Sequence, residues 1–386
     1  MQVITTEKLP IKIWTLSEID PDDENVIQQF RNLANHPLAV KWVCGMVDFH
    51  LGYGMPIGGV MATQGGVIPY AVGLDIGCGM IAAETTLEAA RWNREQYLEL
   101  RRNIHALVPV GQKHRDTPQE SSLLRSMEQG PVVAGQWERA QYQLGTLGGG
   151  NHFIELQVAQ DGRLWIMLHS GSRNIGKRVC DHYHKIAKRY MQDFASAIPD
   201  PELSFLPRSV PEHDLYLTEM RWCMAFAEAS RQRLLQDVLT VLTDAAGTVG
   251  IDRLVDTHHN FAAMENHFGQ NVMIHRKGAV KAKGLVTLPG SMQTASYICE
   301  GLEPAESFNT CSHGAGRTMG RRVANRLMEG RHEEAVAMMA HVAFGVREGQ
   351  YDELGFCYKD IDAVIEAQAD LIRPVVRLEP LAVVKG

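Results

Sequence analysis

The chain has 386 residues, 45% of them hydrophobic, and a formal net charge of −7. This composition is ordinary for a globular protein with a hydrophobic core, and the acidic balance excludes a generally basic nucleic-acid binder, so contact with nucleic acid would need a local basic surface. No apolar run approaches the roughly 18–20 residues that cross a bilayer, and no signal peptide is expected. The seven cysteines do not form a disulfide framework, so we expect a cytoplasmic protein without membrane contact.

The first part of the chain predicts strands with one short helix among them. Residues 11–15 have the pattern of a strand, and residues 22–34 have that of a helix. Between residues 38 and 85 the chain alternates apolar runs, typical of strands, with glycine-rich bends. These runs are LAVKWVCGMVDF, IGGVMAT and VIPYAVGL.

A helix and a hairpin are expected next. Residues 86–106 have a helical pattern, and Thr86 is the expected N-cap. The stretch FIELQVAQDGRLWIML predicts two strands joined by a turn at Asp161 and Gly162.

Long helical patterns dominate the rest of the chain. They cover residues 174–194, 215–245, 317–328, 332–344 and 360–372, the last one stopping before Pro374 and followed by a strand at 375–384. Residues 195–214 contain four prolines and predict an exposed insertion loop. Because strands and helices mix without a regular βαβ alternation, we expect a single α+β domain over residues 1–386 with a central layered β core.

Several short segments place polar residues beside glycines at the ends of apolar runs. They are DFHLGYGMPIG (48–58), DIGCGM (75–80), GTLGGGNHFIE (145–155), HSGSRNIGKR (169–178), DTHHN (256–260), PGSMQTAS (289–296) and CSHGAGRTMGRR (311–322). Each segment alone is compatible with a tight turn that holds an ordinary buried cysteine or histidine. Their recurrence points instead to function built on loops.

The residue types in these segments suit a transition-metal site. A thiolate, imidazoles and a carboxylate together favour Zn²⁺, Mn²⁺ or Fe²⁺ over Ca²⁺ or Mg²⁺. Asp75, Cys78 and three histidines are too many ligands for one tetrahedral ion. Two ions that share the cysteine would accommodate them, as in two-metal phosphoryl chemistry.

The same segments could bind phosphate. The glycine loops can present backbone N–H groups to phosphate oxygens, although neither a Walker A nor a G-x-G-x-x-G pattern is present. Basic residues adjoin the motifs and favour a local trough for phosphates, whereas Arg321 and Arg322 would otherwise be read as a solvated helix face. The eight residues are Arg173, Lys177, Arg178, Arg276, Lys277, Arg317, Arg321 and Arg322.

Taken together, DIGCGM, GGGNHFIE, HSGSRNIG, HHN, PGSM and SHGAGR resemble the motifs of the RtcB family, in the family's order. The resemblance runs from about Asp48 to the last two residues and implies the single-domain RtcB-like α+β fold, a β core surrounded by helices. It also implies a GTP- and Mn²⁺-dependent RNA ligase. Such a ligase joins an RNA 3′-phosphate or 2′,3′-cyclic phosphate end to a 5′-hydroxyl end.

The resemblance also implies roles for individual residues. His313 would be the nucleophile that becomes a histidine–GMP phosphoramidate. Cys78 would bridge two Mn²⁺ ions, with His152 and His169 completing one site and Asp75 and His259 the other. The expected nucleotide site comprises Asn151, His152, Phe153, Ile154, Glu155, His259, Asn260, Pro289, Gly290, Ser291, Met292, Ser296, His313, Gly314, Ala315, Gly316 and Lys385, the last contacting guanine.

Two other functions remain open from the sequence. One is a metal-dependent phosphodiesterase that opens RNA cyclic phosphates or cuts RNA, which would need the metal ligands but not GTP, His313 or Lys385. The other is a non-catalytic protein that binds RNA ends, although a pure binder has no use for a thiolate beside three imidazoles. The sequence also leaves open an activating partner protein and the physiological RNA.

Overall fold

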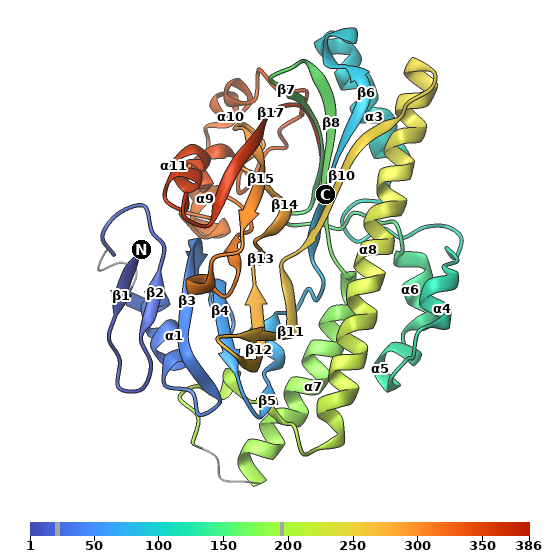
Figure 1. The fold of residues 1–386 in the computed structure, drawn as a ribbon. Helices are drawn as coiled ribbons and strands as arrows, with labels where there is room; N and C mark the ends of the chain where they lie inside the picture. Colours follow the sequence, from blue (N-terminus) through green and yellow to red (C-terminus); the bar gives the residue numbers. More distant parts are fainter. Residues whose placement is uncertain (20–23, 194–196) are drawn as a thin grey trace.

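The computed structural model describes residues 1–19, 24–193 and 197–386. Two β-sheets, in which most neighbouring strands are antiparallel, form its centre (Figure 1). The six-stranded sheet has the order β1 (Gln2–Ile4), β2 (Ile11–Ile13), β3 (Ala39–His50), β4 (Ile57–Thr63), β12 (Gln270–Lys277) and β11 (Asn260–His267). The seven-stranded sheet has the order β10 (Ile251–His258), β6 (Gly79–Glu88), β8 (Arg163–Ser170), β7 (Phe153–Ala159), β17 (Ile372–Lys385), β15 (Ser296–Leu302) and β14 (Lys283–Leu288).

The seven-stranded sheet curls until its two edge strands approach each other. Thr257 in β10 and Thr287 in β14 are joined by a hydrogen bond of 3.2 Å between their hydroxyl oxygens. The sheet is therefore a nearly closed barrel, which protects its edges. Two short pairs complete the β structure: β13 (Ala279–Lys281) with β16 (Thr310–Ser312), and β5 (Gly66–Val67) with β9 (Leu206–Pro207).

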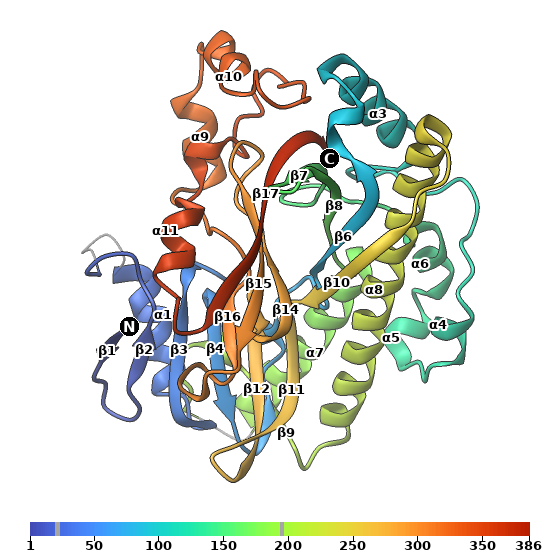
Figure 2. The same cartoon turned by 45° about the horizontal axis from the view of Figure 1, so that its top comes forward.

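Helices cover the sheets. The longer ones are α1 (Glu24–Ala34), α3 (Arg94–Leu107), α7 (Arg173–Asp193) and α8 (Pro211–Ala246). Shorter ones are α2 (Pro69–Val72), α4 (Ser122–Ser126), α5 (Pro131–Ala134), α6 (Trp137–Gln143), α9 (Arg321–Leu327), α10 (His332–Met338) and α11 (Ile361–Glu366). Figure 2 shows α7 and α8 lying along one side of the sheets and α9 and α10 projecting at the top. The expected α+β class, with a β core surrounded by helices, is confirmed.

The main core lies between the seven-stranded sheet and helices α3 and α8. Ile81, Ile166 and Leu168 from the strands pack there with Leu234 and Val238 from α8, and each of these side chains is buried. Complete burial of such a side chain contributes about 1.5–3 kcal/mol, so this face fixes the sheet against the helices. The opposite face of the same strands carries a second buried cluster that includes Met80, Ala82, Trp165 and Met167, and His169 lies at its end.

The N-terminus of the first helix after β6 differs from the expectation. Thr86 is not an N-cap, because β6 continues to Glu88 and the Thr86 hydroxyl accepts a hydrogen bond of 3.0 Å from the Gly250 backbone N–H. The helix begins at Arg94, and Asn93 caps it in a capping box with Gln96. Pairing with the neighbouring strands overrides the local helical pattern.

Two further expectations were wrong. The run VIPYAVGL is not a strand beyond Val67: α2 starts at Pro69, as proline favours at a first helical turn. Residues 197–214 are not simply an exposed loop, because Leu203 and Leu206 are fully buried and β9 pairs with β5. Residues 195 and 196 of that prediction lie outside the described residues.

The remaining expected elements are present with shifted ends. The hairpin at 153–168 and the helices at 174–194 and 215–245 correspond to β7–β8, α7 and α8, while α9, α10 and α11 are shorter than expected. The helix expected at 22–34 is described from Glu24, and residues 22, 23 and 194 lie outside the described residues. Pro374 lies inside β17 at a register shift against β15, the place where a sheet tolerates proline.

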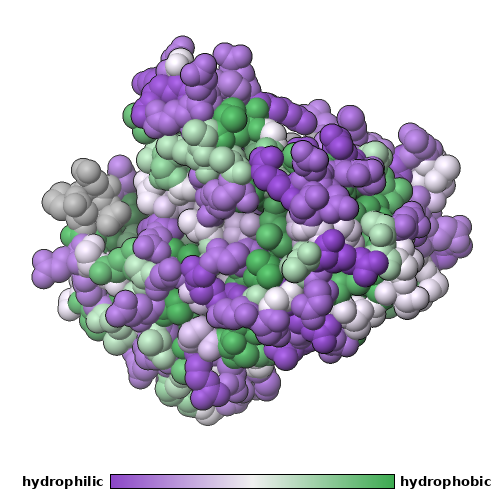
Figure 3. Space-filling model, turned by 90° about the horizontal axis from the view of Figure 1, so that it is seen from above, coloured by the Kyte–Doolittle hydropathy of each residue, from purple (hydrophilic) through white to green (hydrophobic). Residues whose placement is uncertain are grey.

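The surface seen from above is mostly hydrophilic, with hydrophobic side chains in small groups (Figure 3). Among the described helices, none combines the length and the apolar character needed to span a membrane.

Candidate active site

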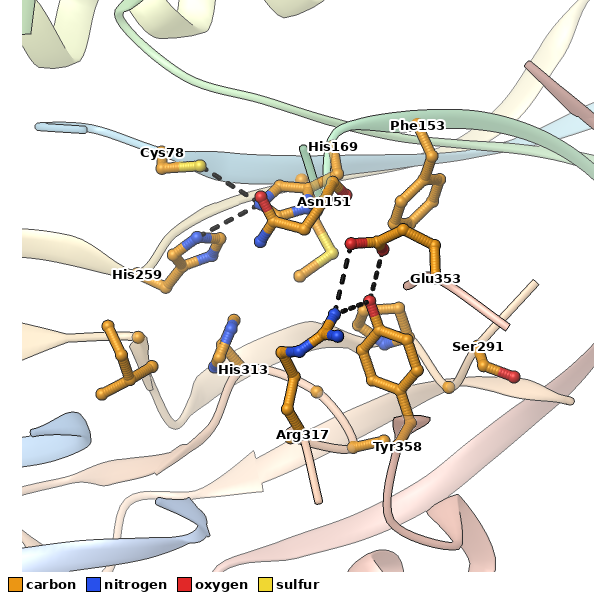
Figure 4. A pocket seen from close by; sticks show the side chains of 18 of the residues that line it. Cys78, Asn151, Phe153, His169, His259, Ser291, His313, Arg317, Glu353 and Tyr358 are labelled. Carbon is orange, nitrogen blue, oxygen red and sulfur yellow. Dashed lines mark hydrogen bonds and ion pairs between the residues drawn. The ribbon is translucent and has the colours of Figure 1, made fainter. Parts of the chain in front are cut away.

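A cavity of about 320 Å³ lies where the two sheets meet the C-terminal loops. This volume is within the range of about 300–1,000 Å³ that is usual for small-molecule sites. Its lining comes from both sheets: His50 and Ile57 belong to the six-stranded sheet, and Phe153, His169 and Lys385 belong to the barrel. Figure 4 shows polar side chains pointing into this space from opposite sides.

Strand pairing brings the expected metal ligands to one end of the cavity. In the barrel, Met80 of β6 pairs with His169 of β8, and His169 pairs in turn with Phe153 of β7. Cys78 directly precedes β6, and His152 directly precedes β7. The His259 backbone N–H donates to the Cys78 carbonyl at 2.9 Å, which adds the segment after β10.

The ligand atoms are close to one another. The Cys78 Sγ lies 3.4 Å from His152 Nε2 and 3.1 Å from His169 Nε2, and all three residues are buried. His259 Nε2 is 3.3 Å from His169 Nε2. Asp75 Oδ2 is 3.1 Å from His152 Nε2. The cluster of Cys78, His152 and His169 can therefore hold a metal ion, with Asp75 and His259 adjoining it.

Backbone carbonyls orient two of these imidazoles. His152 Nδ1 lies 3.0 Å from the Leu147 carbonyl, and His169 Nδ1 lies 3.2 Å from the Asn151 carbonyl. Nδ1–H donation in both rings leaves the Nε2 lone pair directed at the thiol, as in metal-binding histidines.

The charges in the cluster favour a bound cation. Burial first, and then the charge of Asp75, raise the pKa of the Cys78 thiol well above its usual value. Burial also lowers the pKa of His169 and His259, so both rings are neutral. Burial opposes ionisation of Asp75, but its contact with His152 and the charge of Arg173 hold the pKa of Asp75 below the usual value. Because burial and Asp75 disfavour the Cys78 thiolate, a divalent ion bound here would supply the positive charge that stabilises it.

Glycines allow this convergence. Gly77 has φ +72°, and a Cβ there would lie 2.7 Å from the Cα of Met224 in α8. The chain between Asp75 and Cys78 can therefore turn sharply while it stays packed against α8. The glycines around DIGCGM thus aim a carboxylate and a thiol at one point.

His313 lies beside His259, at the edge of the group of expected metal ligands (Figure 4). Its Nδ1 lies 2.5 Å from Oδ2 of the fully buried Asp48, and its backbone N–H donates to the same oxygen at 3.0 Å. His313 Nδ1 makes no hydrogen bond within the described residues, so the side chains of His313 and Asp48 are in close contact without one. The ring centroids of His313 and His259 are 4.7 Å apart. Asp48 therefore holds one ring nitrogen and leaves Nε2 for the cavity.

A network of charges forms the other end of the cavity around Glu353 (Figure 4). Its carboxylate contacts Arg317 at 3.2 Å, Arg321 at 2.8 Å and Lys385 at 2.6 Å, and it accepts a hydrogen bond from Tyr358. Burial would raise the pKa of Glu353, but Lys385 and Arg321 lower it below the usual value. Nearby, burial raises the pKa of Glu155 to about 7 against the opposing charge of Lys385.

Most of the expected site residues line the cavity. Those that do are Asp75, Cys78, Asn151, Phe153, Glu155, His169, His259, Asn260, Pro289, Gly290, Ser291, Met292, Ser296, His313, Gly314, Ala315, Gly316 and Lys385. His152 lies behind them against Asp75 and Cys78. The Ile154 side chain lies in the main core, on the other face of β7, so the cavity does not bring it to the rest.

The expected trough of eight basic residues is wrong. Among the described residues, only Arg317 and Arg321 of that set line the cavity, and both contact Glu353. Arg276 is buried against Glu265, and Lys277 donates to backbone carbonyls. The sequence pattern of cations did not show that folding pairs Arg276 with Glu265 and Arg317 and Arg321 with Glu353. Arg321 is solvated as well as paired: its side chain is 44% exposed, and its guanidinium contacts Asp352 and Glu353.

Sequence reasoning assigned no role to several residues of the site. They are His50, Ile57, Met80, Gly278, Glu353 and Tyr358 in the lining, and Asp48 beside His313. The dense DFHLGYG motif was the available signal for Asp48 and His50. No local pattern marked Glu353 or Tyr358.

Comparisons with known proteins agree with this geometry. The family model described as tRNA-splicing ligase RtcB matches residues 29–136 and 116–386. The chain is 37% identical to the RNA-splicing ligase RtcB of Escherichia coli K12 over all of this chain and 99% of that protein. It is 33% identical to the RNA-splicing ligase RtcB of Mycobacterium tuberculosis, over 93% of this chain and all of that protein. It is 30% identical to the tRNA-splicing ligase RtcB of Pyrobaculum aerophilum, over 98% and 95% of the two chains.

Proposed function

The chain belongs to the RtcB family of RNA-splicing ligases, and we propose that it is an RNA ligase that uses GTP and two Mn²⁺ ions. Its substrates are an RNA end with a 3′-phosphate or 2′,3′-cyclic phosphate and an RNA end with a 5′-hydroxyl. The processes served are RNA repair or tRNA splicing. Residues 1–386 act as one catalytic domain.

The observation that carries the proposal is His313 between a buried carboxylate and a metal-binding cluster in one cavity. Asp48 orients the ring and stabilises the positive charge that develops on it during attack. The buried aspartate of a Ser-His-Asp triad acts on its histidine in the same way. The His313 Nε2 attacks the α-phosphorus of GTP, an N–P bond forms, the bond to the β-phosphate oxygen breaks, and pyrophosphate leaves.

The metal ligands in this proposal are Asp75, Cys78, His152, His169 and His259. Their donor set suits a transition metal such as Mn²⁺, and five donors this close to one another would hold two ions. When bound, the ions neutralise charge on the phosphate under attack. Arg173 lies near Asp75 and Cys78, and its charge moderates that of the carboxylate and the thiolate.

The guanine end of GTP lies toward Lys385 and Glu155. The ammonium of Lys385 can donate a hydrogen bond, and a carboxyl with a pKa of about 7 can donate or accept one. Asn151, Phe153, Asn260, Ser296, the bend from Pro289 to Met292 and the loop from Gly314 to Gly316 surround the rest of the nucleotide. Ile154 supports this wall from the core.

His313-bound GMP then passes to the RNA 3′-phosphate. An oxygen of that phosphate bonds to the α-phosphorus, the N–P bond breaks, and the RNA end becomes a diphosphate activated by its phosphoanhydride bond to GMP. The 5′-hydroxyl oxygen of the second strand attacks the RNA phosphorus, and GMP leaves. A cyclic phosphate must first be opened by water.

We also place the ligase in the cytoplasm. All seven cysteines are free and buried, which supports a reducing compartment.

Labelling with GTP that is radioactive at the α-phosphate, in Mn²⁺, tests the proposal. Wild type and His182→Ala, a change at an exposed histidine on α7, should both retain acid-labile, alkali-stable label, and His313→Ala should retain none. RNA strands with the stated ends should then be joined. If the wild type binds metal and hydrolyses cyclic phosphates but takes up no label from GTP, the alternative function of a phosphodiesterase is favoured instead.

A further inference from the structure

The connection between β3 and β4, residues 51–56, forms one rim of the cavity. His50 precedes it and Ile57 follows it, and both line the cavity. A Cβ added at Gly278 would lie 2.3 Å from Ile57 and 3.2 Å from the His313 ring, so Ile57 and His313 flank the same point. The rim therefore ends within reach of the nucleophile, on the side away from the Lys385 end.

Two residues outside the loop hold its backbone in place. The Gln29 side chain donates to the Gly52 carbonyl at 2.5 Å and accepts from the Gly52 N–H at 3.2 Å. The buried Lys277 ammonium donates to the Tyr53 carbonyl at 2.6 Å. The loop is thus prepared in one conformation before any ligand arrives, which lowers the entropic cost of binding.

This rigid loop leaves two apolar side chains in solvent. Leu51 is 57% exposed and Tyr53 is 69% exposed. Within the described part of the chain, the Tyr53 ring has no aromatic or cationic partner. An exposed aromatic ring beside a nucleic-acid site is suited to stacking on an unpaired base, as in other proteins that bind single strands.

His50 gives the same rim a proton acceptor. Its Nδ1 lies 2.9 Å from the Asp48 carbonyl, and donation there leaves the Nε2 lone pair for the cavity. Burial lowers the pKa of His50, whose charged and titratable neighbours are Asp48, His313 and Lys359, so the ring is neutral near pH 7. The other imidazoles in the cavity wall belong to the metal cluster or to the nucleophile.

We propose that the RNA strand with the 5′-hydroxyl docks on this rim, its first base stacked on Tyr53 and its hydroxyl hydrogen-bonded to His50 Nε2. This inference rests on the proposed function. In the joining step the hydroxyl proton passes to His50 Nε2 and the hydroxyl oxygen bonds to the phosphorus of the activated RNA end. The bond from that phosphorus to GMP breaks. His50 is then a catalytic residue, and Tyr53 selects an unpaired end.

The experiment separates nucleotide transfer from joining. His50→Gln, Tyr53→Ala, Tyr53→Phe and the control His182→Gln are labelled with GTP, and each then joins a 3′-guanylylated strand to a 5′-hydroxyl strand in single turnovers. Tyr53→Ala, Tyr53→Phe and His182→Gln should label as the wild type does, and joining of the guanylylated strand by His50→Gln does not depend on labelling. In the wild type, the joining rate should rise with pH as His50 loses its proton. His50→Gln should slow joining about 10²–10⁴-fold and remove this dependence on pH. Tyr53→Ala should raise the KM for the 5′-hydroxyl strand about 5- to 150-fold, while Tyr53→Phe should not.

A 5′-terminal 2-aminopurine gives a second measure, because its fluorescence should be quenched on binding to wild type and to Tyr53→Phe but not to Tyr53→Ala. Because Tyr53 is exposed, its substitution should not disturb folding. The Tyr53 variants therefore test the docking of the 5′-hydroxyl strand even if His50→Gln does not fold. Normal joining by His50→Gln would overturn the proton transfer, and an unchanged KM in Tyr53→Ala would overturn the docking. Failure of the wild type to label would overturn the proposed function, and with it this inference.

Discussion

The Nδ1 atom of His313 lies 2.5 Å from the Oδ2 atom of Asp48, although 265 residues separate them in the chain. The carboxylate is fully buried, and its Oδ2 faces the imidazole. A carboxylate this close to the imidazole stabilises the positive charge that develops on the ring during attack. Asp48 should therefore matter more to the nucleophilic step than to folding.

Asp48→Asn should slow the transfer of GMP to His313 by about 10²–10⁴-fold, because the amide keeps the shape of the site without its charge. Quench-flow with labelled GTP measures this rate. Metal content should stay at the wild-type level, and Asp362→Asn, an exposed change on α11, serves as the control. A wild-type rate in Asp48→Asn would show that the negative charge of Asp48 has no part in the attack.

Cys78→Ala should abolish Mn²⁺-dependent activity and lower the bound Mn²⁺ at least tenfold, since the thiol lies within 3.4 Å of two imidazole nitrogens. Cys180→Ala is a matched control, because that thiol is equally buried but donates to the Pro69 carbonyl. Elemental analysis and circular dichroism check metal and fold. Full activity of Cys78→Ala would contradict a bridging thiolate.

Gly171→Ala tests the position of Asp75 without removing any ligand. A Cβ at Gly171 would lie 2.2 Å from an oxygen of the Asp75 carboxylate, so the carboxylate must move. Mn²⁺ affinity measured by titration should fall about 10- to 100-fold. Gly320→Ala is the control, because a Cβ there meets nothing within 4 Å. Equal affinities in the two variants would mean that Asp75 is not needed for the metal.

Glu353→Gln should leave Arg317, Arg321 and Lys385 without their shared counter-charge. We expect a loss of about 1–3 kcal/mol in the free energy of unfolding, since Arg321 is partly exposed and its contact is screened. The KM for GTP should change as Lys385 is released. Urea unfolding and GTP titration measure the two effects, and the lack of either would show that the network does not shape the nucleotide site.

Stability should fall between pH 6.5 and 5. Burial lowers the pKa of His36 to about 3 and that of His275 to about 4, while in the unfolded chain both titrate near 6.5. Below pH 6.5 the unfolded state binds protons that the folded state refuses, so each ring costs about 1.4 kcal/mol per pH unit down to its folded pKa. Urea unfolding at several pH values measures the slope. His36→Asn should reduce it, and a flat profile from pH 6.5 to 5 would contradict the prediction.

Much of the local structure was predictable from sequence. The hairpin around Asp161 and Gly162 and the long helices α7 and α8 followed from residue periodicity and turn chemistry. The prediction failed where neighbouring strands decided, as at Thr86, whose hydroxyl bonds to Gly250 instead of capping a helix. Backbone pairing across the sheet outweighs a weak local preference.

The candidate site divides in the same way. By itself the sequence determined the chemistry, because a thiol, carboxylates and histidines between glycines restrict the possible ligands whatever the fold. Only the tertiary structure decided that Asp48 meets His313, that Glu353 gathers three cations, and that Ile154 faces the core. Those outcomes depend on strand register and on how loops from different parts of the chain meet, 265 residues apart for Asp48 and His313 and 36 for Arg317 and Glu353. A one-residue change of register would turn every side chain to the other face, and no local pattern records that choice.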